Sequence, residues 1–232
     1  MLIENHLLSA VVSLGASALA ALAVAAALLA RPWRGWLDDG ERRAVWVASL
    51  LVIGVVWSLR ANFVPGLSMR FLLVTTLVML HGWALAVLGA LLVLASLSAL
   101  GVADWASFGP NLLCTAIVPA LFAGRLHELV HRHLPRNYFV YFFVSVFVGS
   151  ALAWCVAALA RALLLSWSGQ PAISAEVGAD VLALLPLMGF GEAFMNGLLV
   201  ATAVVFKPRW VMSFDDRSYL AARDLGDGDP PR

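Results

Sequence analysis

A series of long apolar segments constrains the fold of this chain more than any other feature of its sequence. A bilayer core about 30 Å thick is crossed by a helix of about 20 mostly apolar residues. Segments that reach or approach this length occupy residues 9–30, 45–59, 69–80, 83–100, 111–127, 138–160 and 181–206. Charged residues make up only 12% of the 232 residues, about half of what soluble domains carry. The sequence therefore predicts an all-α, polytopic integral membrane protein with about seven transmembrane helices.

The Lys and Arg residues indicate how this bundle lies in the membrane. With the N-terminus outside, twelve of the 15 fall on the inner side, and the outer side keeps Arg60, Arg70 and Arg161. Cytoplasmic loops carry an excess of Lys and Arg, so the distribution favours an N-out, C-in orientation. Residues 1–206 are predicted to form a single transmembrane domain, whose first helix is retained because the N-terminus lacks the basic region of a secretory signal. Residues 207–232 are predicted to form a cytoplasmic C-terminal tail that is partly disordered.

The stretch HELVHRH, residues 127 to 133, fits the H-E-x-x-H pattern of zinc metalloproteases. In that pattern two histidines one helical turn apart share a zinc ion, and the glutamate acts as general base. A catalytic zinc also needs a third protein ligand, and His133 points away from the face that His127 and His131 share. A basic helix end closed by Pro135 explains the same residues. We therefore expect the chain not to be an enzyme, with an intramembrane HExxH zinc metalloprotease as the less favoured alternative.

Glu192 is an acidic residue in the middle of the last apolar segment, LLPLMGFGEAFMNGLLV. Polar groups inside a membrane are costly and often mark functional sites. Asn196 lies four residues on, on the same helical face, and small residues such as Gly191, Ala193 and Gly197 allow another helix to approach closely. Both polar residues are predicted to shape a substrate site. A role in packing alone, or as a proton carrier in a proton-coupled transporter, stays open for Glu192.

A second group of polar residues falls at the outer end of the predicted bundle, before the first helix and after the second: Glu4, His6, Asn62, Ser68 and Arg70. The linker ANFVPGLSMR contains Pro65 and Gly66, which predict irregular backbone. Irregular backbone at membrane depth persists only where protein or a watery cavity covers it. These polar residues are therefore candidates for the mouth of a small substrate pocket, and an ordinary connecting loop is the alternative.

The first apolar segment, GASALAALAVAAALLA, carries small residues spaced four apart. Such spacing allows a second helix to pack closely against it. The pairs Ala16 with Ala20 and Ala21 with Ala25 are therefore predicted to contact a helix of a partner subunit.

Three stretches resemble one transporter family in the order in which they occur: NFVPGLSMRFLL, SFGPNLLCTAIVPALF and MGFGEAFMNGLLV. They are similar to the NFP…GxSGHLLG segment, the GAN-type helix start and the IGxGEAxIT segment of CbiM-type membrane subunits of cobalt and nickel energy-coupling factor transporters. That resemblance implies a substrate-capture subunit that takes up a divalent transition metal from outside. It also implies a transmembrane coupling subunit, which the alanine-rich first helix would contact, and cytoplasmic ATPase subunits, since the chain has no nucleotide-binding motif of its own.

The residues that hold the metal in this family are only partly retained. The family opens with MHIPDG and binds metal through the N-terminus and the histidine at position two, where this chain has Leu2. Two further family histidines fall on Arg70 and Leu185, whereas the glutamate of the GEA motif is retained as Glu192. Imidazole is the usual ligand for nickel and its first-row neighbours, so His6 is the candidate metal ligand of a displaced site.

The resemblance thus predicts the substrate-binding permease subunit of an energy-coupling factor-type ABC uptake system, in the bacterial cytoplasmic (inner) membrane. The expected substrate is a cobalt- or nickel-like transition metal ion, and the fixed cation Arg70 makes an anionic substrate or a metal chelate at least as reasonable. A non-transporting membrane scaffold or sensor with the same fold is the alternative, because the family's histidines are missing. No tightly bound cofactor is expected, and no basic, aromatic-interleaved patch indicates a nucleic acid partner.

Overall fold

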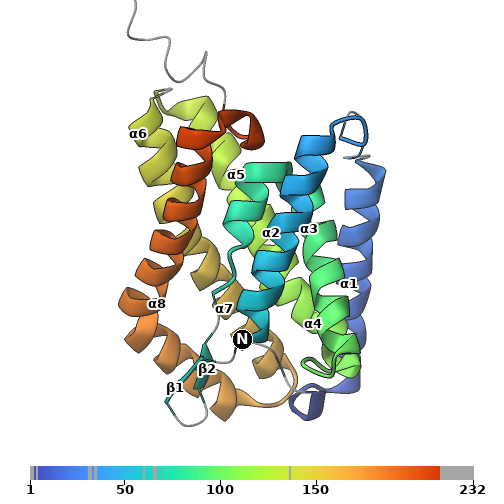
Figure 1. Cartoon of the computed structure of the whole chain (residues 1–232). Coiled ribbons are helices and arrows are strands. Elements are labelled where there is room, and N and C mark those ends of the chain that lie inside the picture. The colour runs from blue at the N-terminus through green and yellow to red at the C-terminus, as the bar shows by residue number, and fades with distance from the viewer. Residues whose placement is uncertain are drawn as a thin grey trace, which may run out of the picture.

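The structure, a computed structural model, describes residues 3, 5–30, 33, 36–59, 61–64, 67–69, 71–135 and 137–214. Helices make up most of this part of the chain (Figure 1). The helices and strands, in chain order, are the 3-10 turn Asn5–Leu7, α1 (Ala10–Leu29), α2 (Gly40–Ser58), β1 (Ala61–Val64), β2 (Leu67–Met69), α3 (Val74–Ala99), the 3-10 turn Trp105–Ser107, α4 (Phe108–Leu112), the π-helical turn Leu113–Ile117, α5 (Val118–His133), α6 (Tyr138–Val140), the π-helix Tyr141–Val148, α7 (Gly149–Trp167), α8 (Pro171–Phe206) and the 3-10 turn Pro208–Trp210.

Within the described residues, the helical stretches that are long and apolar enough to cross a membrane number five: Ala10–Leu29, Val74–Ala99, Trp105–His133, Tyr138–Trp167 and Pro186–Phe206. The prediction of an all-α bundle is therefore confirmed, with the short hairpin β1–β2 added to it. α2 has 19 residues but begins with Glu41, Arg42 and Arg43, which place charge at one of its ends. The count of seven transmembrane helices and the N-out orientation stay predictions.

α3 consists of two helical limbs that meet at Gly82, whose backbone dihedrals are φ 79° and ψ 163°. Contacts with α2 show that the chain reverses there, because they run first backward and then forward along α2: Trp57 with Leu72, Ser49 with His81, Trp46 with Leu85, and Gly54 with Val93. The limbs correspond to the predicted segments 69–80 and 83–100. The first limb is helical only from Val74, and its residues 74–81 rise about 12 Å, less than half of a bilayer core.

Two stretches that the sequence predicts to be connections contain regular structure. The stretch SWSGQPAISAEVGAD is expected to link the last two apolar segments, but α8 already begins at Pro171. Proline is favoured in the first turn of a helix because its missing N–H would have no partner there. The linker around Pro65, predicted to be irregular, contains the antiparallel strands β1 and β2, in which Ala61 pairs with Met69.

The segment that follows α8, residues 207–214, folds back onto the bundle. The N–H of Met212 donates to the carbonyl of Leu80 at 3.2 Å, and the N–H of Ser213 donates to the carbonyl of Met79 at 3.1 Å. The end of the first α3 limb is therefore paired with the C-terminal segment. Residues 215–232 of the predicted tail lie outside the described residues.

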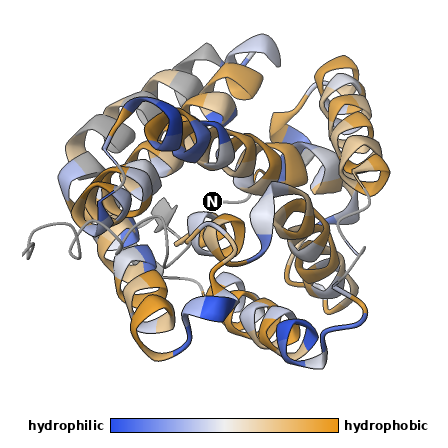
Figure 2. Cartoon of the chain, turned by 90° about the horizontal axis from the view of Figure 1, so that it is seen from above, coloured by the Kyte–Doolittle hydropathy of each residue, from blue (hydrophilic) through white to orange (hydrophobic). Residues whose placement is uncertain are grey.

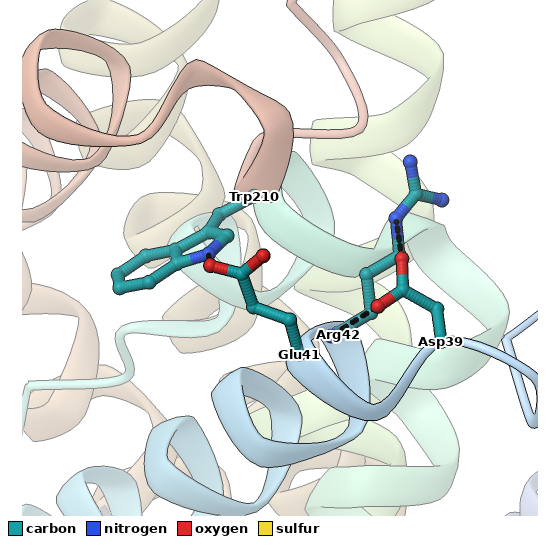
Figure 3. A network of polar contacts seen from close by, with 4 residues as sticks. All are labelled: Asp39, Glu41, Arg42 and Trp210. Atoms are coloured by element: carbon teal, nitrogen blue, oxygen red, sulfur yellow. Dashed lines mark hydrogen bonds and ion pairs between the residues drawn. The ribbon is translucent and has the colours of Figure 1, made fainter.

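The first turn of α2 is held from two sides (Figure 3). Asp39 accepts from the N–H of Arg42 at 3.1 Å, and its carboxylate lies 3.3 Å from Arg42 Nε. Glu41 accepts from Trp210 Nε1 at 2.9 Å and lies 3.7 Å from Lys207 Nζ. The start of α2 and the C-terminal segment are therefore joined at the same end of the bundle.

The hydrophobic core lies around α3, and α1 packs against it through its smallest residues. Ala16, Ala20 and Ala27 are buried, whereas Leu14 and Leu22 on the opposite side of α1 are 71% and 67% exposed. Figure 2 shows hydrophobic residues on helices all round the bundle. A helix that is apolar on every side is typical of a membrane span, so the outer surface of the bundle matches a lipid environment.

Gly82→Ala should destabilise the fold by about 1–3 kcal/mol, because the backbone region of Gly82 is essentially restricted to glycine. A Cβ on residue 82 would also lie 2.6 Å from Met212 Cε. The measurement is thermal unfolding of the detergent-purified protein, followed by loss of the monodisperse elution peak. Gly15→Ala is the matched control, because Gly15 lies in α1 and a Cβ there would meet nothing within 4 Å. Equal melting temperatures for the two variants would contradict the requirement for glycine at the chain reversal.

Candidate functional site

The first limb of α3 begins without a capping side chain of its own. Its N-cap residue, Leu73, has left-handed dihedrals of φ 52° and ψ 14° and an alkyl side chain that cannot accept a hydrogen bond. The first N–H groups of a helix have no partner within the helix, and Leu72 and Leu73 are both buried. An unpaired buried N–H costs about 1–3 kcal/mol, so this helix start requires acceptors from another part of the chain.

Glu192 on α8 supplies these acceptors. Its Oε2 accepts from the N–H of Leu72 at 2.9 Å, and its Oε1 accepts from the N–H of Leu73 at 2.7 Å. Glu192 is 1% exposed, so solvent does not compete for these bonds. The dipole of the helix also favours a negative group at its N-terminus. Glu192 therefore caps a helix that begins more than 100 residues earlier in the chain.

Asn196 extends this cap by one turn of α8. Its Oδ1 accepts from the N–H and the hydroxyl of Thr76 at 2.8 and 2.7 Å. Its Nδ2 donates to the backbone carbonyl of Glu192 at 2.7 Å and to Glu192 Oε1 at 2.9 Å. These contacts use the full hydrogen-bonding capacity of the amide. The two residues lie on one face of α8, as the spacing predicts.

α8 comes close to the start of α3 because small residues lie at the contact. A Cβ on residue 191 would lie 2.9 Å from Phe71 Cε1, just before α3. Ala193, two residues on, is 1% exposed. Gly197 allows a similar approach on the side of the π-helix, where a Cβ would lie 3.4 Å from Phe142 Cζ. Small residues let helix backbones approach in membranes, and here they bring the carboxylate of Glu192 within reach of the α3 backbone.

Ile3, close to the N-terminus, is held inside the bundle by Asn111. The N–H of Ile3 donates to Asn111 Oδ1 at 2.6 Å, and Asn111 Nδ2 donates to the carbonyl of Ile3 at 3.1 Å and to Ser107 Oγ at 3.0 Å. Ile3 is 2% exposed. This contact is not predicted from the sequence. The sequence feature that could have indicated the contact is Asn111 itself, a polar residue at the start of an otherwise apolar segment.

The predicted outer residues are described only in part. Glu4 and Arg70 lie outside the described residues. Asn62 and Ser68 are backbone partners in the β1–β2 hairpin, and His6 is an exposed residue of the first 3-10 turn. The structure therefore brings Asn62 and Ser68 into one register pair, and the roles of all five in substrate binding stay predictions.

The predicted partner contact on α1 divides between two faces of the helix. Ala16 and Ala20 are each 3% exposed and pack inside the chain, so they do not present a surface to another subunit. Ala21 and Ala25 are exposed. The spacing of four holds for both pairs, but only the second pair lies on the outward face, and it alone keeps the predicted role.

The histidines of HELVHRH lie at the C-terminal end of α5 and make packing contacts. The rings of His127 and His131 are 6.2 Å apart, and His127 packs edge-on against Tyr141 at 5.8 Å between ring centroids. His133 Nδ1 lies 3.0 Å from the carbonyl of Leu129. In the described part of the chain, no group of three or more His, Cys, Asp or Glu side chains could hold a metal ion. These contacts are those of a packed helix end.

Glu192→Gln should destabilise the protein by about 1–3 kcal/mol, because glutamine keeps one acceptor and turns an NH₂ group toward a buried N–H. Asn196→Asp should cost more, since it removes both donors to Glu192 and adds a second acidic group beside it. Thermal unfolding in detergent measures both. Glu128→Gln is the control, because Glu128 is exposed, and it should change stability by less than about 0.5 kcal/mol. A melting temperature of Glu192→Gln equal to that of the control would show that the cap does not stabilise α3.

A comparison with protein families agrees with this geometry. The family model CbiM, described as the cobalt uptake substrate-specific transmembrane region, matches residues 3–210. The match begins at the buried Ile3 and ends at Trp210, whose indole contacts α2. A search of the curated proteins gave no match. With most of its length matched and its apolar helices, the chain is a multi-pass membrane protein that belongs to the CbiM family of cobalt uptake transmembrane components.

Proposed function

We propose that this chain is the substrate-capture subunit of an energy-coupled uptake system for cobalt or a closely related transition metal ion. The observation that carries the proposal is the family match over residues 3–210, joined with the retained glutamate of the GEA motif. The metal is the cargo here. Transport requires an energy source, and the proposed partners are a transmembrane coupling subunit and cytoplasmic ATPase subunits of an ABC system in the bacterial cytoplasmic membrane.

Glu192 and Asn196 are proposed to be positioning residues of the substrate site. Their hydrogen-bonding groups already contact α3 or each other. They fix the point at which the chain leaves the β1–β2 hairpin and enters the first limb of α3. Because the hairpin carries Asn62 and Ser68, the cap determines where the proposed outer mouth lies relative to the core.

His6 is the proposed metal ligand, because cobalt and nickel favour imidazole nitrogen. Glu4 would add a carboxylate beside it, and the N-terminal segment is anchored in the bundle through Ile3 and Asn111. Arg70 would oppose a bare cation at the same mouth. The charge of Arg70 therefore favours a cargo ion that arrives with an anionic ligand.

Metal content of the purified protein tests the proposal. After exposure to cobalt, nickel, zinc and copper, each as the free ion and as its citrate complex, elemental analysis should find stoichiometric cobalt or nickel in the wild type, at least tenfold less in His6→Ala, and unchanged content in His127→Ala. Wild-type protein with no bound metal would contradict the proposal and favour a scaffold or sensor that no longer transports. Zinc that is lost only in His127→Ala would support the HExxH alternative.

Arg70→Gln separates the two forms of the cargo. If the cargo is a metal with an anionic chelator, removing the guanidinium should weaken binding of the cobalt–citrate complex roughly tenfold, the loss of one charge-assisted contact. Binding of free cobalt should stay the same or become stronger in that variant, because a repelling cation has been removed. Weaker binding of free cobalt would contradict the assignment of Arg70.

A further inference from the structure

The last three turns of α5 carry cations and apolar side chains on one stripe. Phe122, Arg125, Leu129 and Arg132 follow the spacing that places residues on one helical face. Together with Leu126, Glu128 and His133 they line a surface groove of about 390 Å³. This groove lies at the end of a helical stretch that is long and apolar enough to cross a membrane, Trp105–His133.

A second groove of about 260 Å³ adjoins the first through Arg125 and Glu128, which line both. Its remaining walls are apolar and come from three helices, with Ala26 on α1, Trp83 on α3 and Leu121 on α5 among them. The two grooves therefore form one surface, in which an apolar channel leads to a basic end.

The two arginines on this surface lie near Glu128, which lines the same groove, but they form no ion pair with it in the described part of the chain. Across the described ranges, neither Arg125 nor Arg132 has an ion-pair or hydrogen-bond partner for its side chain. Both residues are exposed, and Glu128 beside them is exposed as well. Long cationic side chains at the end of a membrane helix extend toward the headgroup layer, where lipid phosphate groups can pair with them.

We propose that this surface is a binding site for an anionic phospholipid. The lipid phosphate lies between the guanidinium groups of Arg125 and Arg132, and one acyl chain occupies the apolar channel between α1, α3 and α5. From Arg125 to Ile117, a lining residue deeper in the channel, the helix rises about 12 Å. The site uses the combination of basic end and apolar channel, so neither free phosphate nor a zwitterionic lipid satisfies it.

Retention of lipid by the full-length protein tests this site. The delipidated protein in detergent is incubated with phosphatidylglycerol or with phosphatidylcholine of the same acyl chains, and native mass spectrometry counts bound lipid. The wild type should retain one phosphatidylglycerol in preference to phosphatidylcholine. The double variant Arg125→Gln/Arg132→Gln should lose about 30-fold in affinity, since each arginine near anionic lipid contributes about 1 kcal/mol.

Two controls assign the effect to the proposed contacts. Arg43→Gln removes an exposed arginine of α2 that does not line the groove, and it should leave retention unchanged. Ala26→Phe fills the apolar channel without changing charge, and it should lower binding of phosphatidylglycerol. Each variant is first checked for a monodisperse elution peak at the wild-type position, and lipid binding by the wild type should fall with rising ionic strength.

Three outcomes would overturn the proposal. Equal retention of the two lipids by the wild type would remove the role of charge. Inorganic phosphate that displaces phosphatidylglycerol completely at millimolar concentration would indicate a free-anion site. An unchanged phosphatidylglycerol affinity in the double arginine variant would show that the lipid binds to another surface and not to these grooves. Metal content does not enter this test, so its result is independent of the proposed uptake function.

Discussion

The backbone N–H groups at the start of α3 set the constraint on which the rest of this structure depends. A bilayer core offers no water to pair them, and each polar group there must find its partner inside the protein. Glu192 and Asn196 provide the acceptors, with four hydrogen bonds between 2.7 and 2.9 Å to Leu72, Leu73 and Thr76. The direction in which α3 enters the bundle, and the position of the hairpin before it, follow from this contact.

Much of the bundle could be predicted from the sequence because hydropathy and helical spacing are local properties. The apolar segments, the two limbs joined at Gly82 with almost no loop, and the shared face of Glu192 and Asn196 all depend on residues close together in the chain. The family also follows from local motifs, since the three matching stretches keep their order. Residue spacing alone cannot tell which face of a helix is buried. On α1 the same spacing of four occurs on two faces, but Ala16 is buried and Ala21 is exposed.

The partners of the polar residues could not be predicted, because the groups that they bind are backbone atoms. Nothing in the identity of Leu72 or Leu73 shows that its N–H lacks an acceptor, which results from its place at the start of a helix. The hydrogen bonds between Asn111 and Ile3 join residues 108 positions apart, and the partner is again a backbone group, since Asn111 binds the N–H and the carbonyl of Ile3. The start of α8 at Pro171 escapes a hydropathy analysis for another reason, since it precedes the stretch of α8 that is apolar enough to span a membrane.

The distance along the chain between α3 and its cap has a consequence for biogenesis. Leu72 and Glu192 are 120 positions apart, so the ribosome has made α3, every helical element from α4 to α7 and the first half of α8 before the carboxylate exists. At about 5–20 residues per second, synthesis of that interval takes roughly 6–24 s. During this time the nascent first limb of α3 has no acceptor for its leading N–H groups, and it must be shielded by the insertion machinery or remain at the aqueous interface. α8, the last long helix to be translated, therefore completes the fold of α3.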